Sequence, residues 1–147
     1  MSTPGGKGML SKVLKKRAQL LAVILVLSLL LTATTAFAVS EYITAKKGGV
    51  IGIAQGVKLV ILPRALKEDT LISADMLKKK KRIEFTFEPD GTVFAKPAIL
   101  KIAWSAIEDL EDLVLYGLDG EKIRPRIKGW GLEYRIPHFS LYYFRRR

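Results

Sequence analysis

The stretch Phe87-Glu88-Pro89-Asp90-Gly91-Thr92-Val93-Phe94-Ala95-Lys96-Pro97-Ala98-Ile99-Leu100 decides the fold class of this chain. It contains a turn signal, Pro89-Asp90-Gly91, which separates two runs of strand composition. The run before the turn, Arg82 to Glu88, alternates apolar and polar residues, and so does Ala98 to Trp104 after it. Pro97 has no amide proton for a sheet ladder, so we expect it at a strand edge or where a strand begins. The stretch therefore predicts two strands joined by a turn.

Further short runs of strand composition lie on both sides of this stretch, and turn residues separate them. Asp119-Gly120 is the strongest hairpin signal among those turns. Two segments are expected to be helical instead: 65–69, which follows a proline, and 105–112, where Ser105 and Glu108 form a capping box. The remaining strands are expected at 57–62, 70–74, 92–94, 113–118, 121–124, 132–136 and in the last residues. Seven or more short strands within about 100 residues predict an all-β fold, a single antiparallel β-sandwich.

The first part of the chain has the layout of a targeting segment. Basic residues are frequent up to Arg17, and Ala18 to Ser40 carries no charge. Ala36-Phe37-Ala38 then supplies the small residues that signal peptidase requires, with cleavage expected between Ala38 and Val39. The sequence therefore predicts a leader over residues 1–38 and a β-sandwich domain over residues 39–147.

An uncleaved anchor is the alternative interpretation of the same segment. Its uncharged run is long enough to span a bilayer, which takes about 20 residues. The basic flank would stay inside, and the folded domain would face outward. Both interpretations place the β-sandwich outside the cytoplasm, either secreted or anchored by an N-terminal helix.

The composition excludes several kinds of site. The chain has no cysteine and one histidine, so a disulfide framework, a thiolate zinc site and a multi-histidine metal site are all excluded. We expect no metal and no cofactor. The formal net charge is +11, and part of it belongs to the leader. The basic remainder favours anionic lipid headgroups or acidic wall polymers as partners over nucleic acid.

The densest charge run is Lys78-Lys79-Lys80-Lys81-Arg82, and a second run, Arg145-Arg146-Arg147, ends the sequence. One interpretation is a solvated loop whose charges protect a sheet edge from pairing with another chain. The other is an anion-binding patch to which both runs contribute. We expect binding through such a patch to weaken as salt is added.

Three phrases together resemble one domain family. They are Gly49-Val50 with Val57-Lys58-Leu59-Val60-Ile61-Leu62-Pro63-Arg64-Ala65-Leu66, the stretch from Phe87 to Leu100, and His138-Phe139-Ser140 followed after one residue by Tyr142. All three resemble the ZU-five β-sandwich domain, which occurs in ankyrins, netrin receptors and many secreted bacterial proteins. The resemblance implies the fold rather than a particular partner. One departure is visible, because Arg64 stands where the family's corner has a glycine, so we expect a tighter or helical turn there.

The His138-Phe139-Ser140 triplet also marks self-cleavage in some animal members of the family. By resemblance, Ser140 would attack the carbonyl of Phe139, and His138 would assist proton transfer. The alternative is that the triplet belongs to the closing strand of the sandwich and that the histidine is structural.

The aromatic residues suggest one more hypothesis. An exposed row of aromatic rings would indicate a carbohydrate-binding module, although packing is the usual role of such residues. The residues in question are Trp104, Trp130, Tyr134, Tyr142 and Tyr143.

These observations predict a non-enzymatic, extracytoplasmic β-sandwich used for binding or structural support at the cell surface. Its expected partner is a protein or an anionic polymer or lipid of the envelope. A self-cleaving module that cuts between Phe139 and Ser140 and a carbohydrate-binding module are the two alternatives.

Overall fold

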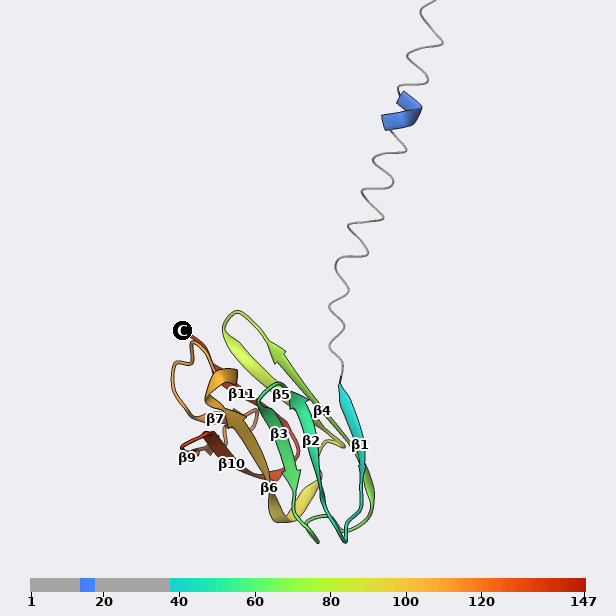
Figure 1. Cartoon of the computed structure of the whole chain (residues 1–147), viewed down its shortest axis with the longest axis vertical. Helices are drawn as coiled ribbons and strands as arrows, with labels where there is room; N and C mark the ends of the chain where they lie inside the picture. The colour runs from blue at the N-terminus through green and yellow to red at the C-terminus, as the bar shows by residue number, and fades with distance from the viewer. Residues whose placement is uncertain (1–13, 18–37) are drawn as a thin grey trace, which may run out of the picture. The chain divides into compact units, whose positions relative to one another are not determined.

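Residues 14–17 and 38–147 are described by the computed structural model (Figure 1). Most of the predicted leader, including Ala36, lies outside these residues. Ala38 and Val39, on either side of the expected cleavage site, are exposed. Within the described ranges, we find no helix that is long and apolar enough to cross a membrane.

The domain consists of eleven strands and one short 3-10 helix. The strands form two sheets in which every described strand pair is antiparallel, ordered β1-β4-β5-β11-β7-β8 and β2-β3-β6-β10-β9. This confirms the all-β prediction. The elements are β1 (Val39–Ile43), β2 (Gly49–Ala54), β3 (Val57–Ile61), β4 (Thr70–Lys78), β5 (Arg82–Glu88), β6 (Val93–Ala103), η1 (Trp104–Ala106), β7 (Leu115–Gly117), β8 (Lys122–Ile123), β9 (Arg126–Lys128), β10 (Gly131–His138) and β11 (Leu141–Arg145).

The core lies between the two sheets, because alternate side chains of each strand turn inward. In β5 the predicted face is confirmed: Ile83, Phe85 and Phe87 are buried. Leu100 and Ile102 of β6 face them from the other sheet as part of the same core cluster. The two sheets therefore pack as a sandwich around one shared core.

The Pro89-Asp90-Gly91 turn carries the chain from one sheet to the other. The two strands that it joins, β5 and β6, belong to different sheets and do not pair. The Phe139 ring fills the corner, with its centroid 5.3 Å from that of Phe87 and 4.8 Å from that of Phe94. This three-ring contact closes the core at that end.

Pro97 lies inside the central strand β6, not at the strand edge that the sequence analysis expected. It falls between Val93 and Ala98, where the pairing of β6 with β10 shifts register around Ile136 and His138. A proline is tolerated at a bulge because no ladder hydrogen bond is needed from its nitrogen.

Neither predicted helix forms. At 65–69 the chain turns instead, because Arg64 takes a φ of 59° and the next two residues, Ala65 and Leu66, are buried in the core. At 105–112 only η1 is helical, and its cap, Ala103, makes no side-chain capping bond. The expected helix was suggested by the capping box of Ser105 and Glu108, but the chain there forms an irregular connection. Three of its side chains pack on the core: Ile107, Leu110 and Leu113.

Candidate functional site

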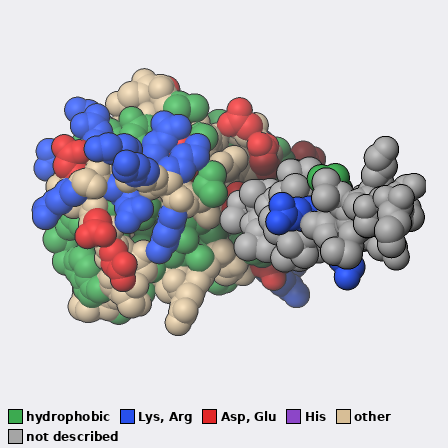
Figure 2. All heavy atoms as spheres, turned by 90° about the horizontal axis from the view of Figure 1, so that it is seen from above, with side chains coloured by type: hydrophobic (Ala, Val, Ile, Leu, Met, Phe, Trp, Pro, Cys, Tyr) green, Lys and Arg blue, Asp and Glu red, His purple; other side chains and the backbone are tan. Residues whose placement is uncertain are grey.

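The two basic runs meet at one end of the sandwich. Arg145 pairs with Arg82 in the β5–β11 register. The backbone amide of Arg146 donates to the carbonyl of Lys81 at 2.9 Å, and its Nη1 donates to the carbonyl of Lys79 at 3.1 Å. We call the surface formed by Lys78–Arg82 and Arg145–Arg147 the basic end. Figure 2 looks onto this end and shows Lys and Arg side chains gathered there.

Part of this charge is neutralised within the domain. Glu84 is buried on the outer face of β5, with its carboxylate 2.6 Å from Lys79 Nζ and in an ion pair with Arg82. Arg146 also forms an ion pair, with its Nη2 3.6 Å from Asp109 Oδ2. A buried carboxylate needs such partners, so Lys79 and Arg82 have a structural task besides any binding. Three of the eight predicted cations are therefore paired inside the domain.

The other cations stay available to a partner. Lys78, Lys80, Lys81 and Arg147 form no ion pair with any residue in 14–17 or 38–147. The Arg145 guanidinium lies 4.3 Å from the centre of a tyrosine ring, a contact that positions the cation without cancelling its charge. The basic end thus presents an arginine held against an aromatic ring beside several exposed lysines.

The first strand of the domain begins on the side of the basic end. Val39 pairs with Ala74, and β1 runs antiparallel to β4, which ends at Lys78. Val39 therefore lies toward the end of β4 that leads into the β4–β5 turn. Figure 1 shows this turn and the C-terminus at the same end of the sandwich.

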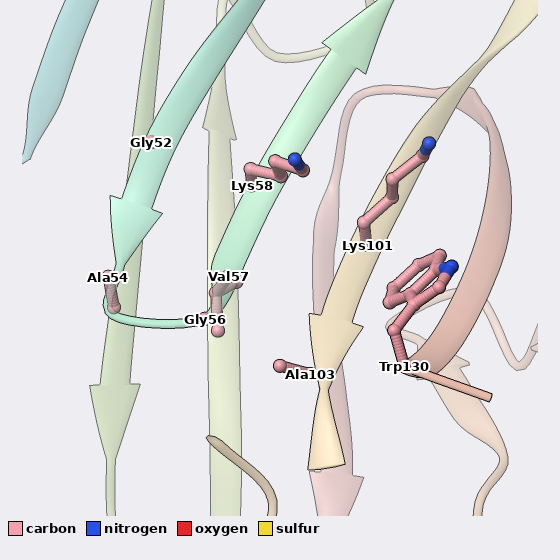
Figure 3. Close-up of a pocket in the computed structure, with 8 residues that line it drawn as sticks. All are labelled: Gly52, Ala54, Gly56, Val57, Lys58, Lys101, Ala103 and Trp130. Carbon is pink, nitrogen blue, oxygen red and sulfur yellow. The ribbon is translucent and has the colours of Figure 1, made fainter. Parts of the chain in front are cut away.

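A shallow hollow of about 470 Å³ lies on the outer face of the second sheet. Small residues such as Gly52 and Ala103 form its floor, and Lys58, Lys101 and Trp130 stand around it (Figure 3). Lys101 Nζ is 5.6 Å from the centre of the Trp130 ring. The hollow combines an apolar floor with two cations and one indole.

The predicted aromatic row does not form as one surface. Tyr134 and Tyr142 are fully buried, whereas Trp104 and Trp130 are 42% and 46% exposed. Tyr143 is half-buried, with the Arg82 guanidinium 5.8 Å from its ring centre. The buried tyrosines serve the core, because burial raises the pKa of both phenols and keeps them as neutral donors.

The His138-Phe139-Ser140 triplet lies at the crossover from β10 to β11, not inside one closing strand. His138 ends β10, and β11 begins at Leu141. Phe139 is held by the β5–β6 turn: its amide donates to the Thr92 carbonyl at 2.8 Å, and its carbonyl accepts from Gly91 at 3.1 Å. The Phe139 ring is fully buried in the core.

The imidazole of His138 turns toward two carboxylates. Its Nε2 is 3.4 Å from Glu121 and 4.0 Å from Asp119, and its Nδ1 is 3.4 Å from the Phe139 carbonyl oxygen. No hydrogen bond joins it to Ser140 among the described residues. The three side chains offer ligand atoms within 4.8 Å of one another, which is the one group of this kind in the described ranges.

Sequence analysis missed this cluster, since Asp119 and Glu121 belong to the β7–β8 hairpin and meet His138 only through the fold. The Asp119 carboxylate is 60% exposed, and carboxylates around a surface histidine need no metal to explain them. The hairpin itself forms as predicted, with Gly120 at a φ of 88°.

Comparison with known proteins found no matching family model and no matching curated protein.

Proposed function

We propose that residues 39–147 are a non-enzymatic, extracytoplasmic binding module of the ZU-five β-sandwich type. The module is secreted or anchored through its leader, and its basic end holds anionic groups of the cell envelope. One observation carries this proposal: the fold brings Arg145–Arg147 into register beside Lys78–Arg82, although the two runs lie far apart in sequence.

The available charge is sufficient for useful affinity. Near an anionic surface each exposed basic residue contributes about 1 kcal/mol, and the effect fades within a Debye length of about 8 Å. Lys78, Lys80, Lys81 and Arg147 are exposed and close enough to act together. Because these terms are electrostatic, added salt should weaken the binding.

The experiment compares two charge-matched double variants of the fragment 39–147, which contains all the strands and the described core. Lys80→Gln with Lys81→Gln removes two charges from the basic end. Lys46→Gln with Lys47→Gln removes two from the β1–β2 turn, where both lysines are also exposed. Binding is measured on anionic vesicles and on a phosphodiester wall polymer, at low and high salt.

We expect the first variant to lose about 30-fold in affinity for its partner, and the control to stay near wild type. Equal losses in both variants would show that only net charge matters. A wild-type fragment that binds neither the vesicles nor the polymer at low salt would overturn the proposal.

A further inference from the structure

We propose that the partner of the basic end is an anionic phospholipid bilayer, with Trp104 and Trp130 lying in its headgroup region. This inference rests on the proposed function and narrows the partner to a membrane surface. The sequence contains two tryptophans, and the fold places both on this end.

The two tryptophans are neighbours although they come from different connections. Trp104 follows the last residue of β6, and Trp130 precedes the first residue of β10. These strand ends pair, with Ala103 opposite Gly131, and the Trp104 amide donates to the Trp130 carbonyl at 3.4 Å. Both residues are more than 40% exposed, so two indole rings are available to a partner at this position.

The tryptophans adjoin the basic end through the β6–β7 connection. That connection begins at Trp104 and is tied to the C-terminal run, since the Glu111 backbone amide donates to the Arg145 carbonyl at 3.0 Å. A second hollow is lined by Ser105, Ala106 and Lys78, so the residues after Trp104 lie beside the β4–β5 turn. Cations and indoles thus occupy one continuous end of the sandwich.

This combination favours a bilayer over a soluble polyanion. An indole prefers the membrane interface, because its ring is apolar and its N–H remains in a polar layer. Lysines reach anionic headgroups while their stems lie along apolar surface. A hydrated polymer offers the cations a partner but offers the exposed rings no apolar layer.

The test uses the intrinsic tryptophan fluorescence of the fragment 39–147, because every tryptophan signal comes from this end. The vesicles contain equal parts of phosphatidylglycerol and phosphatidylcholine, with or without bromine on the acyl chains. We expect a blue shift on binding and quenching by brominated lipid. Trp104→Phe and Trp130→Phe each leave one reporter, and both reporters should be quenched.

Removing both rings should weaken binding to these vesicles without unfolding the domain. We expect Trp104→Ala with Trp130→Ala to lose about tenfold or more in affinity, measured by sedimentation. Leu118→Ser is the matched control, since Leu118 is 65% exposed in the β7–β8 turn at the other end. Circular dichroism checks that each variant is folded.

The outcomes separate this inference from the proposed function. One outcome is binding to vesicles or polymer with no fluorescence change and no loss of affinity in the double tryptophan variant. That outcome would support the proposed function and overturn the inference that the partner is a bilayer. Failure of the wild-type fragment to bind either partner would overturn both. Quenching of both reporters with a weakened double variant would support both.

Discussion

Arg64 has a backbone conformation that glycine adopts more easily. Its φ is 59°, and its amide donates to the Ala45 carbonyl at 2.8 Å, which fixes the corner after β3. A tighter or helical turn was expected because no glycine stands at this corner, but Arg64 itself adopts the left-handed geometry. Tertiary hydrogen bonding therefore overrides the local preference of the residue.

We expect Arg64→Gly to stabilise the domain. The left-handed conformation costs a residue with a Cβ about 1–2 kcal/mol, and the greater freedom of glycine in the unfolded chain offsets part of the gain. A net increase of about 1 kcal/mol should appear in urea unfolding. Arg64→Ala retains the Cβ and should give no such gain, so a glycine variant no more stable than the alanine variant contradicts this account.

Tyr134 makes the stability of the domain sensitive to alkaline pH. Its hydroxyl donates to the Leu113 carbonyl at 2.8 Å, and burial, helped by the charge of Asp112, raises its pKa above the ordinary value of 10.0. Above pH 10 the unfolded chain therefore loses this proton while the folded chain keeps it. Stability is fully present below that pH and falls as the pH rises.

Urea unfolding at a series of pH values checks this point. The phenol should contribute a slope of at most about 1.4 kcal/mol per pH unit above pH 10. Tyr134→Phe should lose about 1 kcal/mol at neutral pH, because one hydrogen bond is gone, and should show a shallower alkaline slope. An unchanged slope in the phenylalanine variant would rule out this tyrosine as a cause.

At the scale of elements, the pairing of β6 with β10 depends on Gly131. Its φ is 156°, and an added Cβ would overlap the Ile102 carbonyl and lie 2.8 Å from the Ala103 Cα. We expect Gly131→Ala to destabilise the domain by more than about 2 kcal/mol in thermal or urea unfolding. Gly52→Ala is the matched control: nothing lies within 4 Å of its added Cβ, and its cost should stay below about 0.5 kcal/mol.

Self-cleavage at the Phe139–Ser140 bond, which lies between β10 and β11, can be measured directly. Phe139 is fully buried, and the backbone of the turn before β6 holds both of its polar groups. We expect intact-mass analysis of denatured protein to show an uncut Phe139–Ser140 bond, both in the wild type and in Ser140→Ala. A pair of fragments that disappears in the alanine variant would establish self-cleavage.

The elements differ in how well the sequence predicts them. The alternating face of β5 and the Asp119-Gly120 hairpin could be predicted, because period-two burial and turn chemistry are local properties. The irregular connection at 105–112 could not, since Ser105 and Glu108 imitate a helix capping box while the backbone of Glu111 pairs with β11. The sequence likewise indicated two basic runs but not that they lie side by side, because their contact depends on the register between β5 and β11.

For the molecule as a whole, Glu84 sets how much positive charge the basic end presents. Its buried carboxylate faces Lys79 and Arg82, so the two cations are partly neutralised. We expect Glu84→Gln to strengthen binding to anionic vesicles about fivefold, because one negative charge is removed. Vesicle sedimentation measures this effect, with a thermal melt to confirm folding.

Glu68→Gln provides the control for that measurement. It makes the same charge change on an exposed residue of the β3–β4 connection, at the other end of the sandwich. Its vesicle affinity should stay close to that of the wild type. Equal strengthening in both variants would mean that the position of the charge is irrelevant.

The shared location of Val39 and Arg147 has a mechanical consequence. β1 is an edge strand, and its first pair, Val39 with Ala74, lies toward the end where Arg147 is also held. A force that pulls Val39 away from Arg147 would therefore act first on the Val39–Ala74 pair. The hydrogen-bonded pairs between β1 and β4 would then break one after another, whereas in shear they would all resist the force together. A domain connected in this way yields at low force, whereas a partner that covers this end would clamp the first pair.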